Sequence, residues 1–193
     1  MRHAAGLAVI LILTQSLAAE PFSHSSGEWR EYHRDWLAAC PSVIDEDGPD
    51  FYSFSCFAST GSQTLNSASL PAYKLTLVQN RLDGTLDVAI TVAADDAVYD
   101  EKRPIVLSFS GEPPIRLLPG IDIETRYNTT NQYFVAAPDL RDRLVALMKE
   151  RAAVTLAVPL EGRMEPVETR LSLQGVMAAL DFMSTNARRV AQY

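Results

Sequence analysis

Residues 72–92 read AYKLTLVQNRLDGTLDVAITV, two alternating segments on either side of an Asp-Gly pair. Alternation of apolar and polar residues is typical of a half-buried strand, and Asp-Gly favours a tight hairpin turn. The sequence therefore predicts strands over 72–79 and 85–92 joined by a turn over 80–84. The apolar positions expected on one face are Leu75, Leu77, Leu86, Val88, Ile90 and Val92.

Outward from this hairpin, short apolar or alternating segments continue in both directions, and Pro and Gly residues fall between them. A polar stretch over 20–26 is expected to be a loose arm, and 41–50 and 61–71 are expected to be loops. The further strands that we predict are 29–40, 51–57, 105–110, 115–118, 121–126, 132–136, 154–158 and 167–173.

Two segments change to the helical period. The first runs from Asp139, a candidate N-cap, to about residue 152, and the second covers 175–188. Many short strands and two helices predict a mainly β fold, either an antiparallel β-sandwich or a partial barrel, with two short α-helices toward the C-terminus.

The first residues have the three parts of a secretory signal peptide. Arg2 and His3 form a basic start, residues 4–13 are apolar, and small residues follow up to Ala19. The apolar part is shorter than the about 20 residues of a membrane anchor. We expect residues 1–19 to be a cleaved signal and residues 20–193 to be one disulfide-stapled β-rich domain, located in the periplasm or secreted.

The charge of the expected mature chain limits its partners. Without Arg2, the 17 basic residues become 16 against 24 acidic ones, a net charge of 16 − 24 = −8. Nucleic acids and anionic lipid surfaces require basic patches, so neither is an expected partner. No later stretch approaches the length of a membrane span.

Cys40 and Cys56 are the two cysteines of the chain. An even number of cysteines in an exported chain indicates a disulfide, here with one connectivity. Closing a loop of about 17 residues stabilises the fold by about 3 kcal/mol. Catalytic redox pairs are the alternative, but they stand two residues apart at a helix start.

Three segments together resemble one known family. Gly27-Glu28-Trp29 and the run from Trp36 to Cys40 precede Cys56 in an aromatic segment, and residues 172–181 read SLQGVMAALD. This pattern resembles the invasion-associated locus B family of exported bacterial proteins. The resemblance implies a periplasmic or secreted protein, associated in some pathogens with host-cell invasion, for which no catalytic residues are assigned.

Residues suited to catalysis or metal binding are few. His24 and His33 are the only histidines after the expected signal, and the acids of 45–50 lack the spacing of a calcium loop. A hydrolase centred on His33 would need a nucleophile, and no nucleophile-elbow sequence is present. We therefore expect no catalytic residues, no metal and no cofactor.

Aromatic residues gather around both cysteines, and Trp29, Tyr32 and Trp36 form the candidate binding patch. Core packing around the disulfide is the alternative, because the faces of these residues are not fixed by the sequence. Our first hypothesis is a non-enzymatic envelope protein that binds another envelope or host protein. A glycan or peptidoglycan-binding module and a hydrolase centred on His33 are the alternatives, and the sequence leaves the oligomeric state open.

Overall fold

The computed structural model describes residues 20–43, 55–80, 84–95, 97–126 and 129–190. The expected signal peptide, the acidic loop and the first half of the predicted strand over 51–57 lie outside these residues. Within them the strands form two antiparallel sheets that pack as a sandwich and do not close into a barrel. The predicted mainly β fold is confirmed.

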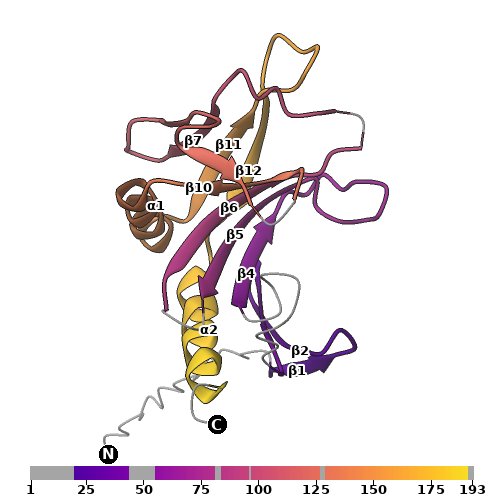
Figure 1. Cartoon of the computed structure of the whole chain (residues 1–193), viewed down its shortest axis with the longest axis vertical. Coiled ribbons are helices and arrows are strands. Elements are labelled where there is room, and N and C mark those ends of the chain that lie inside the picture. Colours follow the sequence, from indigo (N-terminus) through magenta and orange to yellow (C-terminus); the bar gives the residue numbers. More distant parts are fainter. Residues whose placement is uncertain (1–19, 44–54, 81–83, 96, 127–128, 191–193) are drawn as a thin grey trace, which may run out of the picture.

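The larger sheet has the strand order β1-β2-β3-β4-β5-β6-β10-β9 within the described residues, and the smaller has the order β12-β11-β7-β8 (Figure 1). The strands of the larger sheet are β1 Phe22–His24, β2 Glu28–His33, β3 Trp36–Pro41, β4 Ser55–Gly61, β5 Tyr73–Asn80, β6 Leu86–Val92, β9 Ile123–Thr125 and β10 Gln132–Val135. Those of the smaller are β7 Ile105–Phe109, β8 Ile115–Leu117, β11 Ala153–Val158 and β12 Val167–Ser172.

The central hairpin forms as the sequence predicts. β5 and β6 pair in antiparallel register from Tyr73 opposite Val92 to Gln79 opposite Leu86. Leu75, Leu77, Val88 and Ile90 are all buried in the main core, because they share the inner face of the sheet.

Three elements cover that inner face. Helix α2 (Val176–Val190) packs on β3 and β4, strand β12 crosses β4 and β5, and helix α1 (Pro138–Glu150) packs on β6 and β10. One continuous apolar cluster joins both sheets and both helices. No described helix has the length and apolarity needed to cross a membrane.

Helix α1 begins one residue before the predicted start. Ala137 is its N-cap and makes no side-chain capping bond, and Pro138 occupies the first turn. Proline suits this position because its fixed φ is helical and its missing N–H has no intrahelical acceptor there. Asp139, the predicted N-cap, is instead the acidic residue of the first turn, where it interacts favourably with the helix dipole.

Two predictions near the N-terminus are wrong. The predicted strand over 29–40 is a hairpin, because the chain reverses at Arg34 and Asp35, with Arg34 at a φ of 55°. The predicted loose arm over 20–26 contains strand β1, which pairs with β2. Both errors have the same origin. A short strand, and a turn without glycine or proline, have weak local sequence signals, because their conformation depends on the strands with which they pair.

Candidate functional site

The first three strands place the candidate residues at an edge of the larger sheet. β1 pairs with β2 along one side, with Phe22 opposite Arg30, and it is the last strand on that side of the sheet among the residues that the structure describes. β2 continues into β3 through the turn at Arg34. We call the strands β1, β2 and β3 the ribbon. Figure 1 shows β1 and β2 of this ribbon beside one end of α2, far from the loops around β7 and β11.

Three large aromatic side chains of this ribbon are open to solvent. Phe22 is 39% exposed, Trp29 is 45% exposed and Tyr32 is 53% exposed. We call these three residues the aromatic ribbon. Exposed aromatic residues grouped on one structural element are typical of interaction sites, since aromatic residues are enriched at protein interfaces.

Trp36 does not belong to the patch that the sequence predicts. Its side chain is fully buried in the core, and its indole Nε1 donates a hydrogen bond to the backbone oxygen of Ser172 at 3.2 Å. The register explains the difference, because Trp36 lies opposite His33 on the face that α2 covers. For Trp36 the alternative of core packing is therefore correct.

The two exposed residues of the predicted patch lie on opposite faces. Trp29 is opposite Cys40 and shares the face that α2 covers, whereas Tyr32 is opposite Leu37 on the other face. They are three positions apart along one strand, and an odd number of positions places two side chains on opposite faces. Tyr32 instead stacks on Phe22, with ring centroids 6.1 Å apart and planes inclined by 17°.

A charged pair accompanies the stacked rings on the outer face. The Arg30 guanidinium contacts a Glu28 oxygen at 2.6 Å and also donates to it through Nε at 2.7 Å. The Ser26 hydroxyl donates to the same carboxylate at 3.1 Å. The outer face therefore combines apolar rings with polar groups, the mixture typical of an interface.

The turn between β2 and β3 is fixed to the start of α2. Arg34 donates from Nη1 to the Gln174 side-chain oxygen at 3.1 Å, and the Ser172 hydroxyl donates to Asp35 at 2.6 Å. Gly175 has a φ of +103°, and a Cβ at this position would lie 1.9 Å from the backbone oxygen of His33. This close approach requires glycine and holds the ribbon in one position.

His33 pairs with an acid but with no hydroxyl. Its Nδ1 lies 3.7 Å from Glu31 Oε1, and its ring is 5.9 Å from that of Phe182. Its Nε2 is buried and has no hydrogen-bond partner in the described part of the chain. The other nearby acid, Asp35, is bonded to Ser172 instead, so the described residues around His33 do not form a Ser-His-Asp arrangement.

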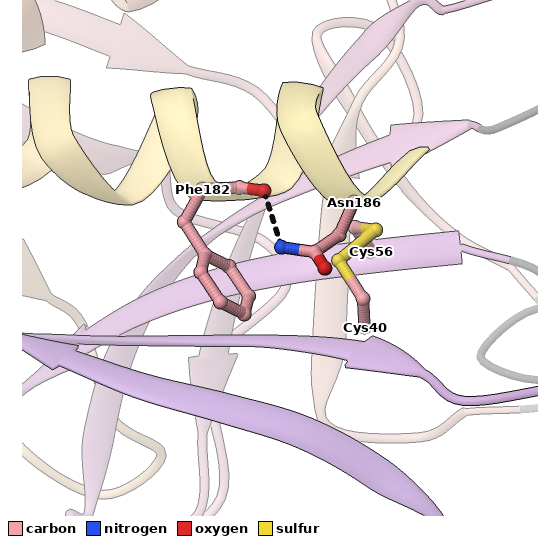
Figure 2. Close-up of a disulfide and its surroundings, with 4 residues drawn as sticks. All are labelled: Cys40, Cys56, Phe182 and Asn186. Atoms are coloured by element: carbon pink, nitrogen blue, oxygen red, sulfur yellow. Dashed lines mark hydrogen bonds between the residues drawn. A yellow bond between two sulfur atoms is a disulfide. The ribbon is translucent and has the colours of Figure 1, made fainter. Parts of the chain in front are cut away.

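The predicted disulfide between Cys40 and Cys56 is present. The register of β3 and β4 places the two residues directly opposite each other, and both are buried. Figure 2 shows the bond beneath α2, next to Asn186, whose Nδ2 donates to the backbone oxygen of Phe182 at 2.9 Å. The bond therefore fixes the sheet next to the strand that carries Trp29.

Metal-ligating side chains do not converge in the part of the chain that the structure describes, where no group of three or more His, Cys, Asp or Glu is found. Comparisons with protein-family models, with curated proteins and with solved structures found no match. The resemblance to the invasion-associated locus B family stays a prediction from the sequence.

Proposed function

We propose that the protein is an exported, non-catalytic protein of the bacterial envelope that binds another envelope or host protein through the aromatic ribbon. The observation that carries this proposal is the exposure of Phe22, Trp29 and Tyr32 on one edge of the larger sheet. Large exposed aromatic residues supply most of the binding energy in many protein complexes.

The edge position supports a protein as the partner. No described strand lies beside the outer side of β1, so its backbone groups are proposed to pair with a strand of another chain. Strand addition of this kind gives affinity through main-chain hydrogen bonds and specificity through side chains on alternating faces. Here Phe22 and Tyr32 on one face and Trp29 on the other would supply the specificity.

The Cys40–Cys56 disulfide supports the proposed periplasmic or secreted location, because such bonds persist in oxidising compartments. The resemblance of residues 27–29, 36–40 and 172–181 to the invasion-associated locus B family supports an envelope role that is linked in some pathogens to host-cell invasion. The same resemblance includes Gly175, which the structure places against the backbone of His33.

A capture experiment tests the proposal. The mature domain is immobilised and exposed to envelope extract, and each captured protein is purified and titrated against variants. Trp29→Ser and Tyr32→Ser are expected to weaken binding at least tenfold. Met177→Ser is the matched control, because Met177 is exposed and apolar but lies on α2. Equal affinity of all three variants for every captured protein would overturn the proposal.

Glycan binding is the second candidate, because the exposed rings of Trp29 and Tyr32 are also able to stack on sugars. The two tryptophans make this testable, since Trp29 is 45% exposed and Trp36 is fully buried. Soluble peptidoglycan fragments would then change the fluorescence of the native protein but not that of Trp29→Phe. An unchanged spectrum of the native protein counts against a glycan ligand at Trp29.

A further inference from the structure

Strand β12 is the longest strand at an edge of either sheet among the residues that the structure describes. It has six residues, whereas the other edge strands, β1, β8 and β9, have three each. A strand at an edge leaves one row of backbone N–H and C=O groups unpaired, and such a row is a template for pairing with another chain. β12 belongs to the smaller sheet, so this edge is separate from the aromatic ribbon.

The backbone groups on the free side of β12 come from its even-numbered residues. The Leu173 N–H donates to the Ala152 backbone oxygen at 2.9 Å, on the side of β11. Successive residues of a strand direct their backbone groups to alternate sides, and the pairing of β12 with β11 has one unbroken register. The even-numbered residues therefore face away from β11, and the Ser172 oxygen agrees, because it accepts from Trp36.

The part of this edge that is able to pair is its centre. Pro166 has no N–H to donate, and the Ser172 oxygen is already engaged. Between these two positions, Glu168 and Arg170 present their N–H and C=O groups to the free side, and both residues are exposed. A strand that pairs with β12 is therefore expected to centre on Thr169.

The exposed face of β12 carries one acid and one base. Glu168 lies opposite Ala157 of β11, and Arg170 lies opposite Thr155, so neither faces an opposite charge across the sheet. Neither side chain makes a salt bridge to another described residue. Opposite charges on facing positions stabilise a strand pair. The matching partner strand would therefore place a base opposite Glu168 and an acid opposite Arg170.

A second copy of β12 meets this requirement. When two β12 strands pair antiparallel about a two-fold axis at Thr169, Glu168 of each copy lies opposite Arg170 of the other. An axis at Glu168 or at Arg170 would instead place two like charges opposite each other, which is destabilising. The charges of the strand therefore select a single register.

We propose that two copies of the protein associate through their β12 strands, so that the smaller sheets join into one continuous antiparallel sheet. Glu168 and Arg170 of opposite copies form a hydrogen-bonded pair, in which each residue donates its N–H to the C=O of the other. The two-fold axis supplies this pair twice. Because the contact is one short strand from each copy, the dimer is weak and reversible.

Sedimentation velocity of the disulfide-bonded protein tests the proposal, at concentrations from about 10 μM to about 1 mM in about 0.15 M salt. We expect a reversible equilibrium between monomer and dimer. Glu168→Arg and Arg170→Glu are each expected to weaken the dimer about tenfold or more, because each places like charges opposite each other in both pairs. A native protein that stays monomeric at every concentration would refute a second copy as the partner of this edge.

Mixing the two variants distinguishes this register from a general effect of charge. Glu168→Arg presents two bases and Arg170→Glu presents two acids, so the mixture is expected to form a heterodimer in which both pairs are opposite in charge. The double variant Glu168→Arg/Arg170→Glu restores the same pairs in reverse, and its dissociation constant is expected to lie within about threefold of the native value. A mixture that associates no better than either variant alone would overturn the proposal.

Asp181→Arg is the matched control, because it makes the same change of charge at an exposed acid on α2. Its dissociation constant is expected to equal that of the native protein. If Asp181→Arg weakens the dimer as much as Glu168→Arg, the association does not depend on β12 and the proposal is wrong.

Discussion

Replacing Gly175 by alanine tests the contact that fixes the aromatic ribbon to the rest of the domain. The added Cβ would lie 1.9 Å from the His33 backbone oxygen and 2.8 Å from its carbonyl carbon, whereas real Cβ atoms stay beyond 3.0 Å. The neighbour is backbone and not a flexible side chain, so the β2–β3 turn must move by more than an ångström. Such a movement also separates Arg34 from Gln174.

The magnitude follows from three costs and one offset. A left-handed backbone costs an L-residue about 1–2 kcal/mol, which the lower entropy of the unfolded alanine chain offsets by about 0.4–1 kcal/mol. Overpacking of this kind adds about 1–3 kcal/mol. Loss of the two hydrogen bonds to Gln174, from Arg34 and from the Asp35 backbone N–H, adds about 0.5–1.5 kcal/mol each. We therefore expect Gly175→Ala to lower the free energy of unfolding by at least about 2 kcal/mol.

Urea denaturation of the oxidised domain measures the effect, and Gly162→Ala is the matched control. Gly162 also has a positive φ, +73°, but nothing lies within 4 Å of the position of its Cβ. This control therefore carries the backbone cost alone, expected to be within about 1 kcal/mol of the native protein. If the two variants lose the same free energy, within about 0.5 kcal/mol, the contact with His33 does not fix the ribbon and our reasoning is wrong.

Three further predictions concern other parts of the domain. The double variant Cys40→Ser/Cys56→Ser is expected to lose about 3 kcal/mol in urea denaturation, and an unchanged midpoint would show that the disulfide contributes no stability. Arg103→Ala removes charged hydrogen bonds to three backbone oxygens after β11, at 2.8–2.9 Å, and is expected to cost about 2–3 kcal/mol; a loss below about 0.5 kcal/mol would refute it. Because the pKa of Tyr133 is raised from 10.0 to about 12, its contribution to stability is complete below pH 10.0 and is lost as the pH rises to about 12. Alkaline denaturation should therefore be less steep in Tyr133→Phe, and equal slopes would contradict the raised pKa.

The parts of the fold that the sequence predicted are those with local signals. The hairpin of β5 and β6 follows from alternation on both sides of an Asp-Gly pair. β12 follows from the alternation of Val167, Thr169 and Leu171, and the structure confirms the less exposed face that these residues share. In each case neighbouring residues determine both the element and its buried face.

The turn at Arg34 and Asp35 was not predictable because residues far away in the sequence stabilise it. An arginine at a φ of 55° is unusual, and of the two residues only Asp35 is a common turn former. Gln174 and Ser172 supply the compensating hydrogen bonds from about 140 positions along the chain. Gly175 also contacts the backbone of His33 from this distant segment, and the sequence marks it only as the start of a helix.

The same turn explains why the candidate patch was only partly predictable. A single strand over 29–40 would place Trp36 with Tyr32, since both have even numbers, and Trp29 on the other face. The reversal at Arg34 instead places Trp36 opposite His33, on the face of Trp29, where α2 buries it. The exposed residues Trp29 and Tyr32 then point to opposite sides of a thin ribbon.

This arrangement restricts how a partner is able to bind. A partner that lies flat on one face contacts either Trp29 or the stacked pair of Phe22 and Tyr32, but not both. A partner that adds a strand at β1 contacts the edge, so its side chains reach both faces, because they alternate along a strand. Loss of affinity in both Trp29→Ser and Tyr32→Ser therefore indicates edge binding, whereas loss in only one identifies the face that the partner covers.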